Sequence, residues 1–374
     1  MKKAIVAIIS LGVILCSDIE YFKENCEPLV KMLSYFVKKS VNRNRVLMKF
    51  DKNTALELIT NSKYPMLTGT DSNLYFVDLY FGSSQIETKT AVKVFTILKA
   101  DYQQEQTNAR NELSTLLEIK SKEKMLQMHG CFYEETETDF KLFILQEPMI
   151  SEVTRYHLAT GNQNGIIDTK IIDNFHKLDF SERLNVYKDI LEQMLILHNL
   201  NIAHGDLNPN KLMFANEGGT KVKIIDFGSV RSAEESNDFC FGPMDENTAI
   251  ELNNKRIDLV SVAFSIGAME INEENVSDQF IMMMEAVEDQ IYPKQSEFME
   301  YSQKRLEEVE HSTDFQDCSF VNFIRTLTDV KNIDVTVEQA IKWIDLIQEG
   351  LKTNANPNET PAEGNGICKQ TMII

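Results

Sequence analysis

The sequence has no excess of positive charge. It contains 38 lysines and arginines against 57 aspartates and glutamates, so its formal net charge is −19 at pH 7. This negative charge repels nucleic-acid phosphates and anionic lipid head groups, and we expect neither as a general partner. Two interpretations remain open: an ordinary solvated acidic surface, or a preference for basic protein substrates.

The sequence also lacks closely spaced cysteine pairs. Its six cysteines stand at positions 16, 26, 131, 240, 318 and 368, and none belongs to a C-x-x-C pair. Zinc sites and thioredoxin-like redox chemistry are therefore unsupported. So scattered a set also differs from the disulfide framework of a small secreted domain.

The amino terminus lacks an apolar run of membrane-spanning length. Lys2 and Lys3 precede an apolar run from Ala4 to Cys16, whereas a span needs roughly 20 residues. A cationic start before a short apolar run is typical of a secretory signal, so we predict a signal peptide over residues 1–17 and no span in the mature chain. Leu15 is large for the cleavage rule, and the alternative is a buried amino-terminal strand or helix of a cytoplasmic protein.

Apolar spacing predicts a change of structure along the first half of the chain. Residues 18–64 are expected to form a helical extension that packs on the main domain, because Leu29, Leu33 and Phe36 recur at helical spacing. From residue 65 the pattern is β-rich. It predicts strands over 74–81, 90–95, 128–133 and 142–145 and a helix over 101–120.

The second half of the chain is expected to be mainly helical. A strong amphipathic helix is predicted over residues 181–200, followed by a short strand pair over 212–215 and 221–225. The last segment, residues 350–374, is rich in asparagine, proline and glycine. Such a composition is typical of a disordered tail.

Two short segments of the second half carry the chemistry. Residues 204–211 read His-Gly-Asp-Leu-Asn-Pro-Asn-Lys, and residues 226–228 read Asp-Phe-Gly. Together, after a long helix and separated by a strand hairpin, they resemble the catalytic loop and the D-F-G motif of the protein kinase superfamily. The resemblance implies an α+β, protein-kinase-like bilobal fold that holds a nucleotide between its lobes. It places a five-stranded antiparallel N-lobe sheet with one helix over 65–148 and a mainly helical C-lobe over 149–349.

The resemblance assigns roles to four charged residues. Lys93 matches the lysine that neutralises nucleotide phosphates, and Glu112, 19 residues later, matches its partner on the following helix. Asp206 would orient the acceptor hydroxyl and accept its proton. Asp226 would hold Mg²⁺ through its carboxylate oxygens. The implied ligands are therefore ATP and Mg²⁺, and the implied partner is a protein.

The same register places an adenine site. Ala91 and Met213 would form its apolar walls, and backbone groups of Glu147 and Met149 would hydrogen-bond the base. Gln146 stands at the position that the family calls the gatekeeper. These assignments follow from motif position alone.

The phosphate-binding loop departs from the family pattern. Of G-x-G-x-x-G-x-V only Gly69 is present, although those glycines let backbone amides approach the phosphates. Asp71 adds a negative charge to the same stretch, which disfavours phosphate binding unless a cation intervenes. A weakened grip on the phosphates is therefore expected.

The catalytic loop departs from the pattern at its last residue. Lys211 replaces the asparagine that binds the second metal, and an ammonium group cannot ligate a cation. Lys211 is expected to pair with Asp206 or Asp226, or to supply a fixed charge in place of a metal. The alternative is that Asn210 takes the metal-binding role. We also expect Asp258 to hydrogen-bond the backbone of the turn at His204.

These features support two main hypotheses. The first is a divergent protein serine/threonine kinase with ATP-dependent phosphotransferase activity. The second is a pseudokinase, which binds a nucleotide or a protein partner with little or no catalysis. A small-molecule phosphotransferase of the same fold is a third, weaker reading, because fold alone does not decide function.

Overall fold

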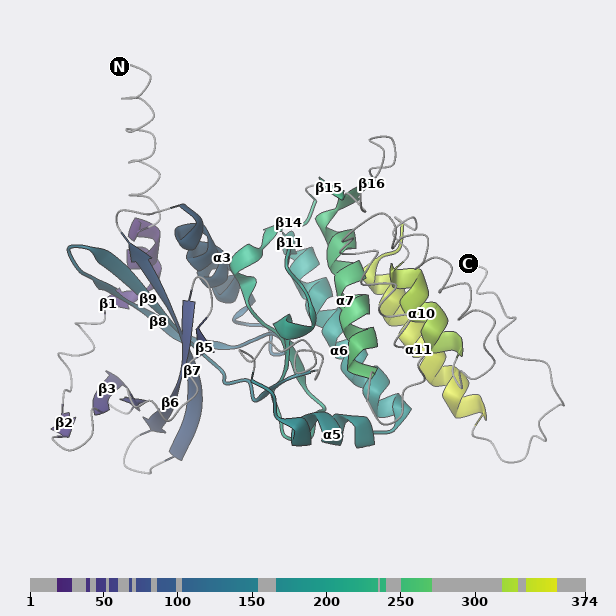
Figure 1. The fold of residues 1–374 in the computed structure, drawn as a ribbon, viewed down its shortest axis with the longest axis horizontal. Coiled ribbons are helices and arrows are strands. Elements are labelled where there is room, and N and C mark those ends of the chain that lie inside the picture. The colour runs from purple at the N-terminus through teal and green to yellow at the C-terminus, as the bar shows by residue number, and fades with distance from the viewer. Residues whose placement is uncertain are drawn as a thin grey trace, which may run out of the picture. The chain divides into compact units, whose positions relative to one another are not determined.

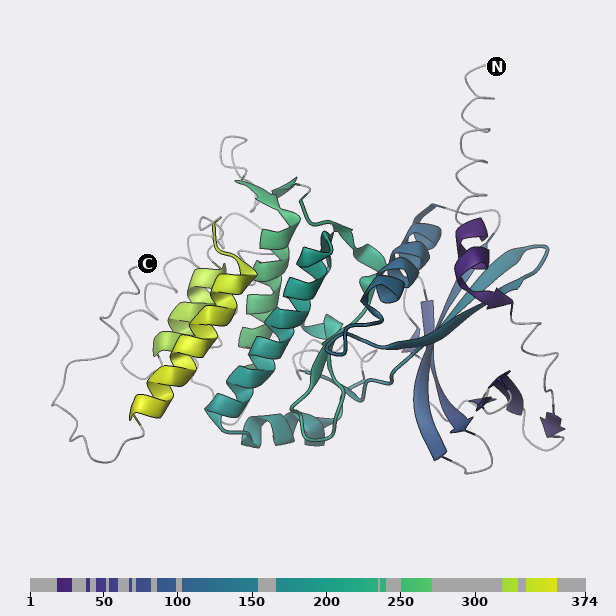
Figure 2. The same cartoon turned by 180° about the vertical axis from the view of Figure 1, so that it is seen from behind.

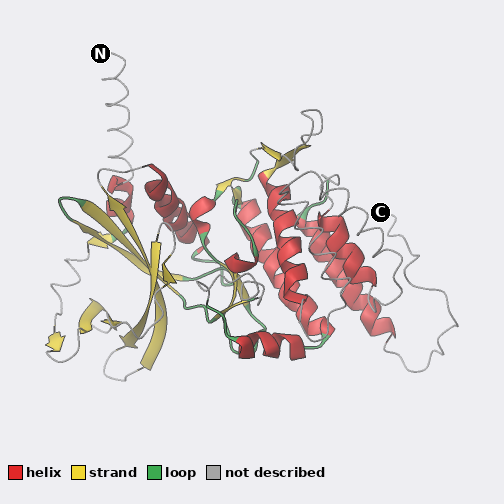
Figure 3. Cartoon of the chain, viewed as in Figure 1, coloured by secondary structure: helices red, strands yellow, loops and turns green. Residues whose placement is uncertain are grey.

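The computed structural model describes residues 19–28, 38–40, 45–51, 54–59, 67–68, 72–81, 86–98, 103–153, 166–234, 236–239, 250–270, 318–328 and 334–354. The chain divides into two compact units. The first contains Met1–Met149 and Asp226–Ser229, and the second contains Ile150–Ile225 and Val230–Ile374. Figure 3 shows strands as the main element of the first unit and helices as the main element of the second.

The first unit is built on a nine-stranded sheet with the order β1-β8-β9-β7-β6-β4-β3-β2, in which β5 also pairs with β6. Every pairing is antiparallel except that of β1 with β8. The sheet has more strands than the five predicted over residues 65–148, because four of its strands come from residues before 65. The strands are β1 (Glu27–Pro28), β2 (Lys38–Ser40), β3 (Arg45–Asp51), β4 (Thr54–Ile59), β5 (Leu67–Thr68), β6 (Ser72–Phe81), β7 (Ile86–Leu98), β8 (Met128–Glu135) and β9 (Asp139–Gln146).

The additional strands come from the segment that we expected to be helical. Residues 19–25 do form a helix, but β1, β2, β3 and β4 follow it. The apolar positions that suggested helical spacing, from Leu29 to Phe36, lie outside the described residues. In β4 the apolar Leu56 and Leu58 alternate with Glu57, and this period of two is the strand signal that the helical interpretation overlooked.

Helix α3 (Gln103–Ile119) packs on the sheet of the first unit (Figures 1 and 2). Its predicted range, 101–120, is close to the observed one. Leu113 and Leu116 on α3, Phe95 on β7 and Phe140 on β9 are almost completely buried. Burial of each such side chain stabilises the fold by about 1.5–3 kcal/mol, so α3 is held to the sheet by the hydrophobic effect.

Five described helices dominate the second unit. In both Figure 1 and Figure 2, α6 runs beside α7, and α10 runs beside α11. The helices are α5 (Thr169–Lys177), α6 (Phe180–Asn199), α7 (Asn254–Glu270), α10 (Cys318–Thr328) and α11 (Val337–Asn354). Helix α11 continues five residues beyond 349, into the segment predicted to be a tail; residues 355–374 lie outside the described residues.

The long helix α6 shows why its prediction from the sequence succeeds. Asp179 Oδ1 accepts a hydrogen bond from the Glu182 N–H at 2.8 Å, and Glu182 Oε2 accepts one from the Asp179 N–H at 2.9 Å. This capping box satisfies two backbone donors at the start of the helix. The apolar positions at helical spacing, including Leu184, Tyr187 and Leu191, are all buried.

Short strands complete the second unit. Strands β10, β12 and β13 form an antiparallel three-stranded sheet, which contains the predicted hairpin, while β11 pairs with β14 and β15 pairs with β16. Among the described helices, none is both long and apolar enough to cross a membrane. The bounds are β10 (Ser151–Glu152), β11 (Ile202–Ala203), β12 (Leu212–Phe214), β13 (Val222–Ile224), β14 (Arg231–Ser232), β15 (Ser236–Phe239) and β16 (Ile250–Asn253), with 3₁₀ turns η1 (Pro209–Lys211) and η2 (Phe227–Ser229).

Candidate functional site

Three charged side chains meet in the first unit. The Lys93 ammonium on β7 donates a hydrogen bond to Asp226 Oδ1 at 2.6 Å and lies 3.1 Å from Glu112 Oε2 on α3. The Glu112 side chain is completely buried, whereas that of Asp226 is 35% exposed. The ion pair expected between Lys93 and Glu112 is therefore present, and Asp226 joins it.

The electrostatics of this cluster keep Lys93 charged. Burial by itself lowers the pKa of Lys93, but the carboxylates of Glu112 and Asp226 outweigh it and raise that pKa above its ordinary value. Burial raises the pKa of Glu112, and the charge of Lys93 acts against this shift. The lysine thus compensates a buried carboxylate that would otherwise be costly to ionise.

Backbone geometry holds the D-F-G residues against α3. Asp226 has a φ of 68°, a left-handed conformation that aspartate tolerates better than most residues. Asn111 Nδ2 donates a hydrogen bond to the Gly228 carbonyl at 3.1 Å. A Cβ on Gly228 would lie 3.4 Å from Asn108 Cβ, an ordinary van der Waals contact, so this residue packs against α3 without strictly requiring glycine.

The catalytic-loop segment lies in the second unit, and α7 fixes its backbone. Asp258 accepts hydrogen bonds from the backbone N–H of His204 at 2.7 Å and of Gly205 at 3.0 Å, as predicted. The His204 ring Nε2 lies 3.0 Å from the Ile225 carbonyl oxygen. Gly205 has a φ of 76°, a conformation that favours glycine. This turn holds Asp206, whose side chain is 51% exposed.

Lys211 lies beside the catalytic-loop aspartate. Its Nζ is 3.6 Å from Asp206 Oδ2, so of the two partners that the sequence left open the structure shows Asp206. Asn208 Nδ2 also lies 3.5 Å from Asp206 Oδ1. The amide oxygen of Asn210 is buried without a hydrogen-bond partner among the described residues, so the alternative that Asn210 takes the metal-binding role stays a prediction.

Glu152 on β10 is a charged residue that the sequence analysis missed. It is 8% exposed, and its Oε2 has no hydrogen-bond partner among the described residues. Burial raises the pKa of Glu152 to about 7, while the charge of Lys211 acts to lower it. Lys211 therefore influences two carboxyl groups of the second unit. No motif marks position 152, so the sequence offered no signal for it.

The residues assigned to an adenine site divide between the units. In the first unit Ala91 and Gln146 face each other across β7 and β9 and are both buried, and Gln146 Oε1 has no hydrogen-bond partner among the described residues. The Glu147 N–H already donates to the Gln127 carbonyl at 2.9 Å, so it is engaged within the fold. Met149 is buried in the first unit and Met213 in the second.

The phosphate-binding loop and the metal site were also expected from the sequence. Gly69 and Asp71 of the glycine-poor loop lie outside the described residues. Within the described ranges, no group of three or more His, Cys, Asp or Glu side chains could hold a metal ion by itself. A metal at Asp226 would therefore need ligands from elsewhere, such as phosphate oxygens and water.

Comparison with known proteins adds an independent finding. The chain matches the protein kinase domain family over residues 81–249, which include Lys93, Glu112, Asp206 and Asp226. It is 27% identical over 174 residues to the smooth muscle myosin light chain kinase of Gallus gallus, covering 44% of this chain and 8% of that protein. It is 30% identical over 122 residues to the probable serine/threonine-protein kinase fhkA of Dictyostelium discoideum, covering 32% and 18%.

A third relative is similar over a comparable stretch. The match to myosin light chain kinase family member 4 of Homo sapiens is 26% identical over 146 residues and covers 39% of this chain and 33% of that protein. The chain thus spans only 8–33% of the length of these three relatives. The matched family and these relatives agree with the mixed α and β architecture, and residues 81–249 of the chain are similar to the protein kinase domain family.

Proposed function

We propose that this chain is a divergent protein kinase that binds ATP and transfers its γ-phosphate to serine or threonine hydroxyls of proteins. The observation that carries the proposal is the cluster in which Lys93 lies 2.6 Å from Asp226 and 3.1 Å from Glu112. A buried ion pair is weak support for stability, because desolvating its charges costs several kcal/mol. Holding the Lys93 ammonium in position for a phosphate would give this buried ion pair a role other than stability.

The first unit has a group suited to the base of the nucleotide. The Gln146 amide oxygen is buried without a partner among the described residues, next to Ala91 in the neighbouring strand. An unsatisfied buried acceptor costs about 1–3 kcal/mol, which a donor on a ligand can recover. The amino group of adenine is such a donor, and this fit favours a nucleotide as the ligand.

Asp226 is suited to Mg²⁺ that arrives with the nucleotide. Mg²⁺ takes oxygen ligands and usually relies on one or two carboxylates together with substrate phosphates, so the absence of a closed ligand cluster in the described chain fits this mode. When bound, the ion neutralises charge that develops on the phosphates. Lys93 keeps its own charge and can transfer its hydrogen bond from Asp226 to a phosphate oxygen.

Asp206 is the proposed base in the second unit. Its exposed carboxylate can accept the proton of a protein hydroxyl, and the hydrogen bonds of Asp258 to the preceding turn fix its position. Lys211, 3.6 Å from Asp206, would supply a fixed positive charge at the position where the family resemblance places a second metal. This charge can attract a transferring phosphoryl group, which is anionic.

The alternative is a pseudokinase that binds a nucleotide or a protein partner without turnover. The observation that favours it is the same contact between Lys211 and Asp206, because an ion pair competes for the carboxylate that must accept a proton. The two functions differ in phosphate transfer, whereas a pseudokinase that binds a nucleotide shares nucleotide binding with the enzyme. Transfer must therefore be measured together with binding.

The test uses the full chain with ATP, Mg²⁺ and a mixture of basic proteins. Asp206→Asn should leave the Kd for ATP unchanged and reduce phosphate transfer by about 10²-fold or more, because a positioned base contributes that much. Asp334→Asn, at an exposed position, is the matched control and should leave transfer unchanged. Binding without transfer to any acceptor would favour the pseudokinase, and no nucleotide binding at all would refute the proposal.

We also propose that the protein enters the secretory pathway. A disulfide joins Cys26 to Cys131 in the first unit, and disulfides persist mainly in oxidising compartments. The predicted signal over residues 1–17 leads to the same compartment. Sequencing the amino terminus of the protein purified from its natural source tests this: a start near Ser17 is expected, and a start at Met1 would contradict it.

A further inference from the structure

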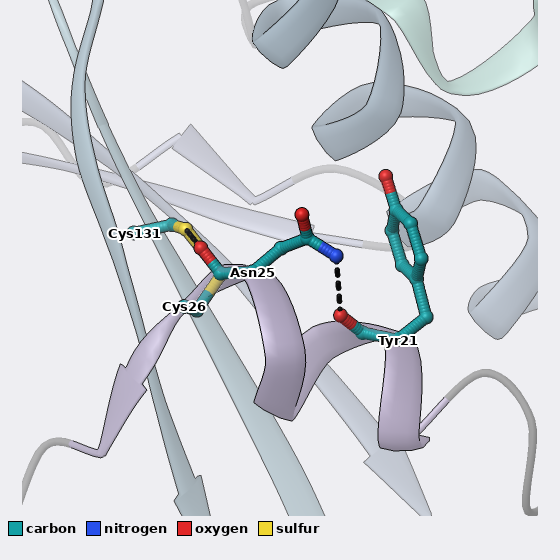
Figure 4. The surroundings of a disulfide bond; sticks show 4 residues. All are labelled: Tyr21, Asn25, Cys26 and Cys131. Carbon is teal, nitrogen blue, oxygen red and sulfur yellow. Dashed lines mark hydrogen bonds between the residues drawn. A yellow bond between two sulfur atoms is a disulfide. The ribbon is translucent and has the colours of Figure 1, made fainter.

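The amino-terminal segment of residues 19–28 is attached to the first unit by a covalent bond. Cys26 and Cys131 form a disulfide between residues 105 apart in the sequence, with a Cα–Cα distance of 5.0 Å. Beyond the disulfide, β1 continues alongside β8. Figure 4 shows the disulfide and the Tyr21 ring on opposite sides of the short helix of residues 19–25. The segment can therefore contact two parts of the first unit at once.

The sheet side of this segment is well packed. Phe22 is completely buried, and its ring stacks on that of Phe140 at 5.6 Å between centroids. Lys23 Nζ lies 3.0 Å from Glu135 Oε2 at the end of β8. These contacts and the disulfide fix the short helix to β8 and β9. The helix is therefore a rigid attachment rather than a loose extension.

The other side of the segment contacts α3. The Arg110 guanidinium carbon lies 5.1 Å from the centroid of the Tyr21 ring, a distance suited to a cation–π contact. Burial raises the pKa of Tyr21, and the charges of Arg110 and Glu118 act on it in opposite directions. Arg110 and Glu118 are two helical turns apart on α3, so the Tyr21 ring lies along that helix.

Helix α3 carries the residues that form the phosphate-facing cluster. Glu112, two positions after Arg110, holds Lys93 at 3.1 Å, and Asn111 donates a hydrogen bond to the Gly228 carbonyl at 3.1 Å. A shift of α3 would therefore move the partner of Lys93 and the support of the D-F-G turn together. The contact of Tyr21 with Arg110 acts within one turn of these residues.

We propose that the disulfide between Cys26 and Cys131 is a redox-sensitive clamp that keeps α3, and with it Glu112, in place for the Lys93 pair. Reduction releases the segment of residues 19–28, loosens α3 and weakens the binding of nucleotide phosphates. Tyr21 is the positioning residue through which the clamp acts on α3. The proposal rests on the proposed nucleotide-binding function.

The chemical step is an exchange with a dithiol reductant. One thiolate of the dithiol attacks a sulfur of the disulfide, which breaks the bond between Cys26 and Cys131 and forms a mixed disulfide. The second thiol of the reductant then closes its own disulfide and releases the protein. Two electrons and two protons pass to the two cysteines, which become thiols. An oxidising compartment keeps the clamp closed, and a reducing one opens it.

The experiment measures the Kd of ATP and of adenosine for the full chain before and after treatment with dithiothreitol. Reduction should weaken ATP binding about five-fold or more, a typical coupling between two sites. It should leave adenosine binding unchanged, because adenosine has no phosphate for Lys93 to hold. General unfolding would weaken the binding of both ATP and adenosine. Comparing the two ligands therefore distinguishes a loosened α3 from an unfolded protein. Equal ATP binding in both redox states would overturn the clamp.

Variants separate the sulfur chemistry from the contact with α3. The double variant Cys26→Ser/Cys131→Ser should bind ATP as the reduced protein does and should not respond to dithiothreitol. Tyr21→Ala should weaken ATP binding with the disulfide intact, whereas the matched Tyr21→Phe keeps the ring beside Arg110 and should bind normally. If Tyr21→Ala binds ATP as tightly as the unchanged chain, Tyr21 has no positioning role and the proposed route through α3 is refuted.

A second measurement distinguishes failure of the clamp from failure of the proposed function. Hydrogen exchange of the α3 amides, recorded without nucleotide, should accelerate on reduction, because the helix loses its anchored neighbour. If the oxidised chain binds no ATP, both proposals fall. If it binds ATP but α3 exchanges at the same rate in both redox states, the clamp alone is refuted.

Discussion

In the first unit the ammonium of Lys93 is enclosed by two carboxylates, whereas in the second unit the carboxylate of Asp206 is half exposed beside the ammonium of Lys211. The first arrangement preserves the charges that the kinase family uses to bind phosphates. The second places a cation where the family coordinates one. The comparison shows that the described charged residues of the first unit keep the family pattern, whereas those of the second unit depart from it at Lys211.

The largest effect on stability is expected from a substitution that breaks the enclosed cluster of Lys93. Lys93→Met leaves the carboxylate of Glu112 buried without compensation, so we expect the free energy of unfolding to fall by about 3–5 kcal/mol. Urea denaturation measures this change. The double variant Lys93→Met/Glu112→Gln removes the stranded charge and should recover much of the loss. If the double variant is as unstable as the single one, Glu112 does not depend on Lys93 for compensation.

The next largest effect is expected from a substitution that disrupts the turn holding Asp206. Asp258→Ala leaves the backbone N–H groups of His204 and Gly205 without their acceptor, at a cost of about 2–4 kcal/mol. Phosphate transfer should fall strongly, while the Kd for ATP should change little because Lys93 and Glu112 are untouched. Equilibrium unfolding and a transfer assay test both halves. An equal loss of binding and transfer would show that the two units respond as one.

The third effect is a dependence on pH in the second unit. The pKa of Glu152 is raised from its ordinary value to about 7, so the folded state binds its proton more tightly than the unfolded state does. The stability that this provides is complete below the unfolded pKa and is lost as the pH rises through about 7. Glu152→Gln should therefore stabilise the chain by about 1–2 kcal/mol at pH 8 relative to its effect at pH 5.5.

Unfolding curves of the Glu152→Gln variant and the unchanged chain at both pH values measure this difference. Glu217→Gln, at an exposed turn, is the matched control and should show no such dependence. A difference in stability that is the same at both pH values would contradict the raised pKa of Glu152.

The smallest effect on stability, and the most informative about divergence, comes from Lys211→Asn. The ion pair with Asp206 is largely exposed, so its loss should cost less than about 1 kcal/mol. Nucleotide binding should become more dependent on Mg²⁺, because an asparagine oxygen can ligate the ion that an ammonium repels. A titration of Mg²⁺ in an ATP-binding assay tests this. An unchanged titration would mean that Lys211 does not stand at the metal-binding position.

Local periodicity and motif spacing account for what the sequence predicted correctly. Helices α3 and α6 and strands β6, β7 and β9 follow from the spacing of their own apolar residues. The ion pair of Lys93 with Glu112 and the hydrogen bonds of Asp258 followed from motifs that fix position in the fold. In each case the signal lies within a short stretch or in a pattern with one known arrangement.

The features that the sequence did not predict depend on contacts between residues far apart in the chain. The disulfide between Cys26 and Cys131 joins positions 105 apart, and the spacing of six scattered cysteines does not indicate which two will meet. Glu152 has a raised pKa only because the fold buries it near Lys211. The strands β2, β3 and β4 were missed because an apolar pattern near Leu33 was extended over the whole segment.

The pairing of β1 with β8 has a consequence for expressing the protein in pieces. β1 pairs with Phe132 and Tyr133 and so covers part of β8, the next strand at this edge of the sheet, and an uncovered strand offers free N–H and C=O groups to other chains. A truncated protein that begins at residue 65, where the family resemblance starts, would expose that strand and leave Cys131 as a free thiol. Such a fragment should self-associate, so the shortest tractable form must begin before Phe22.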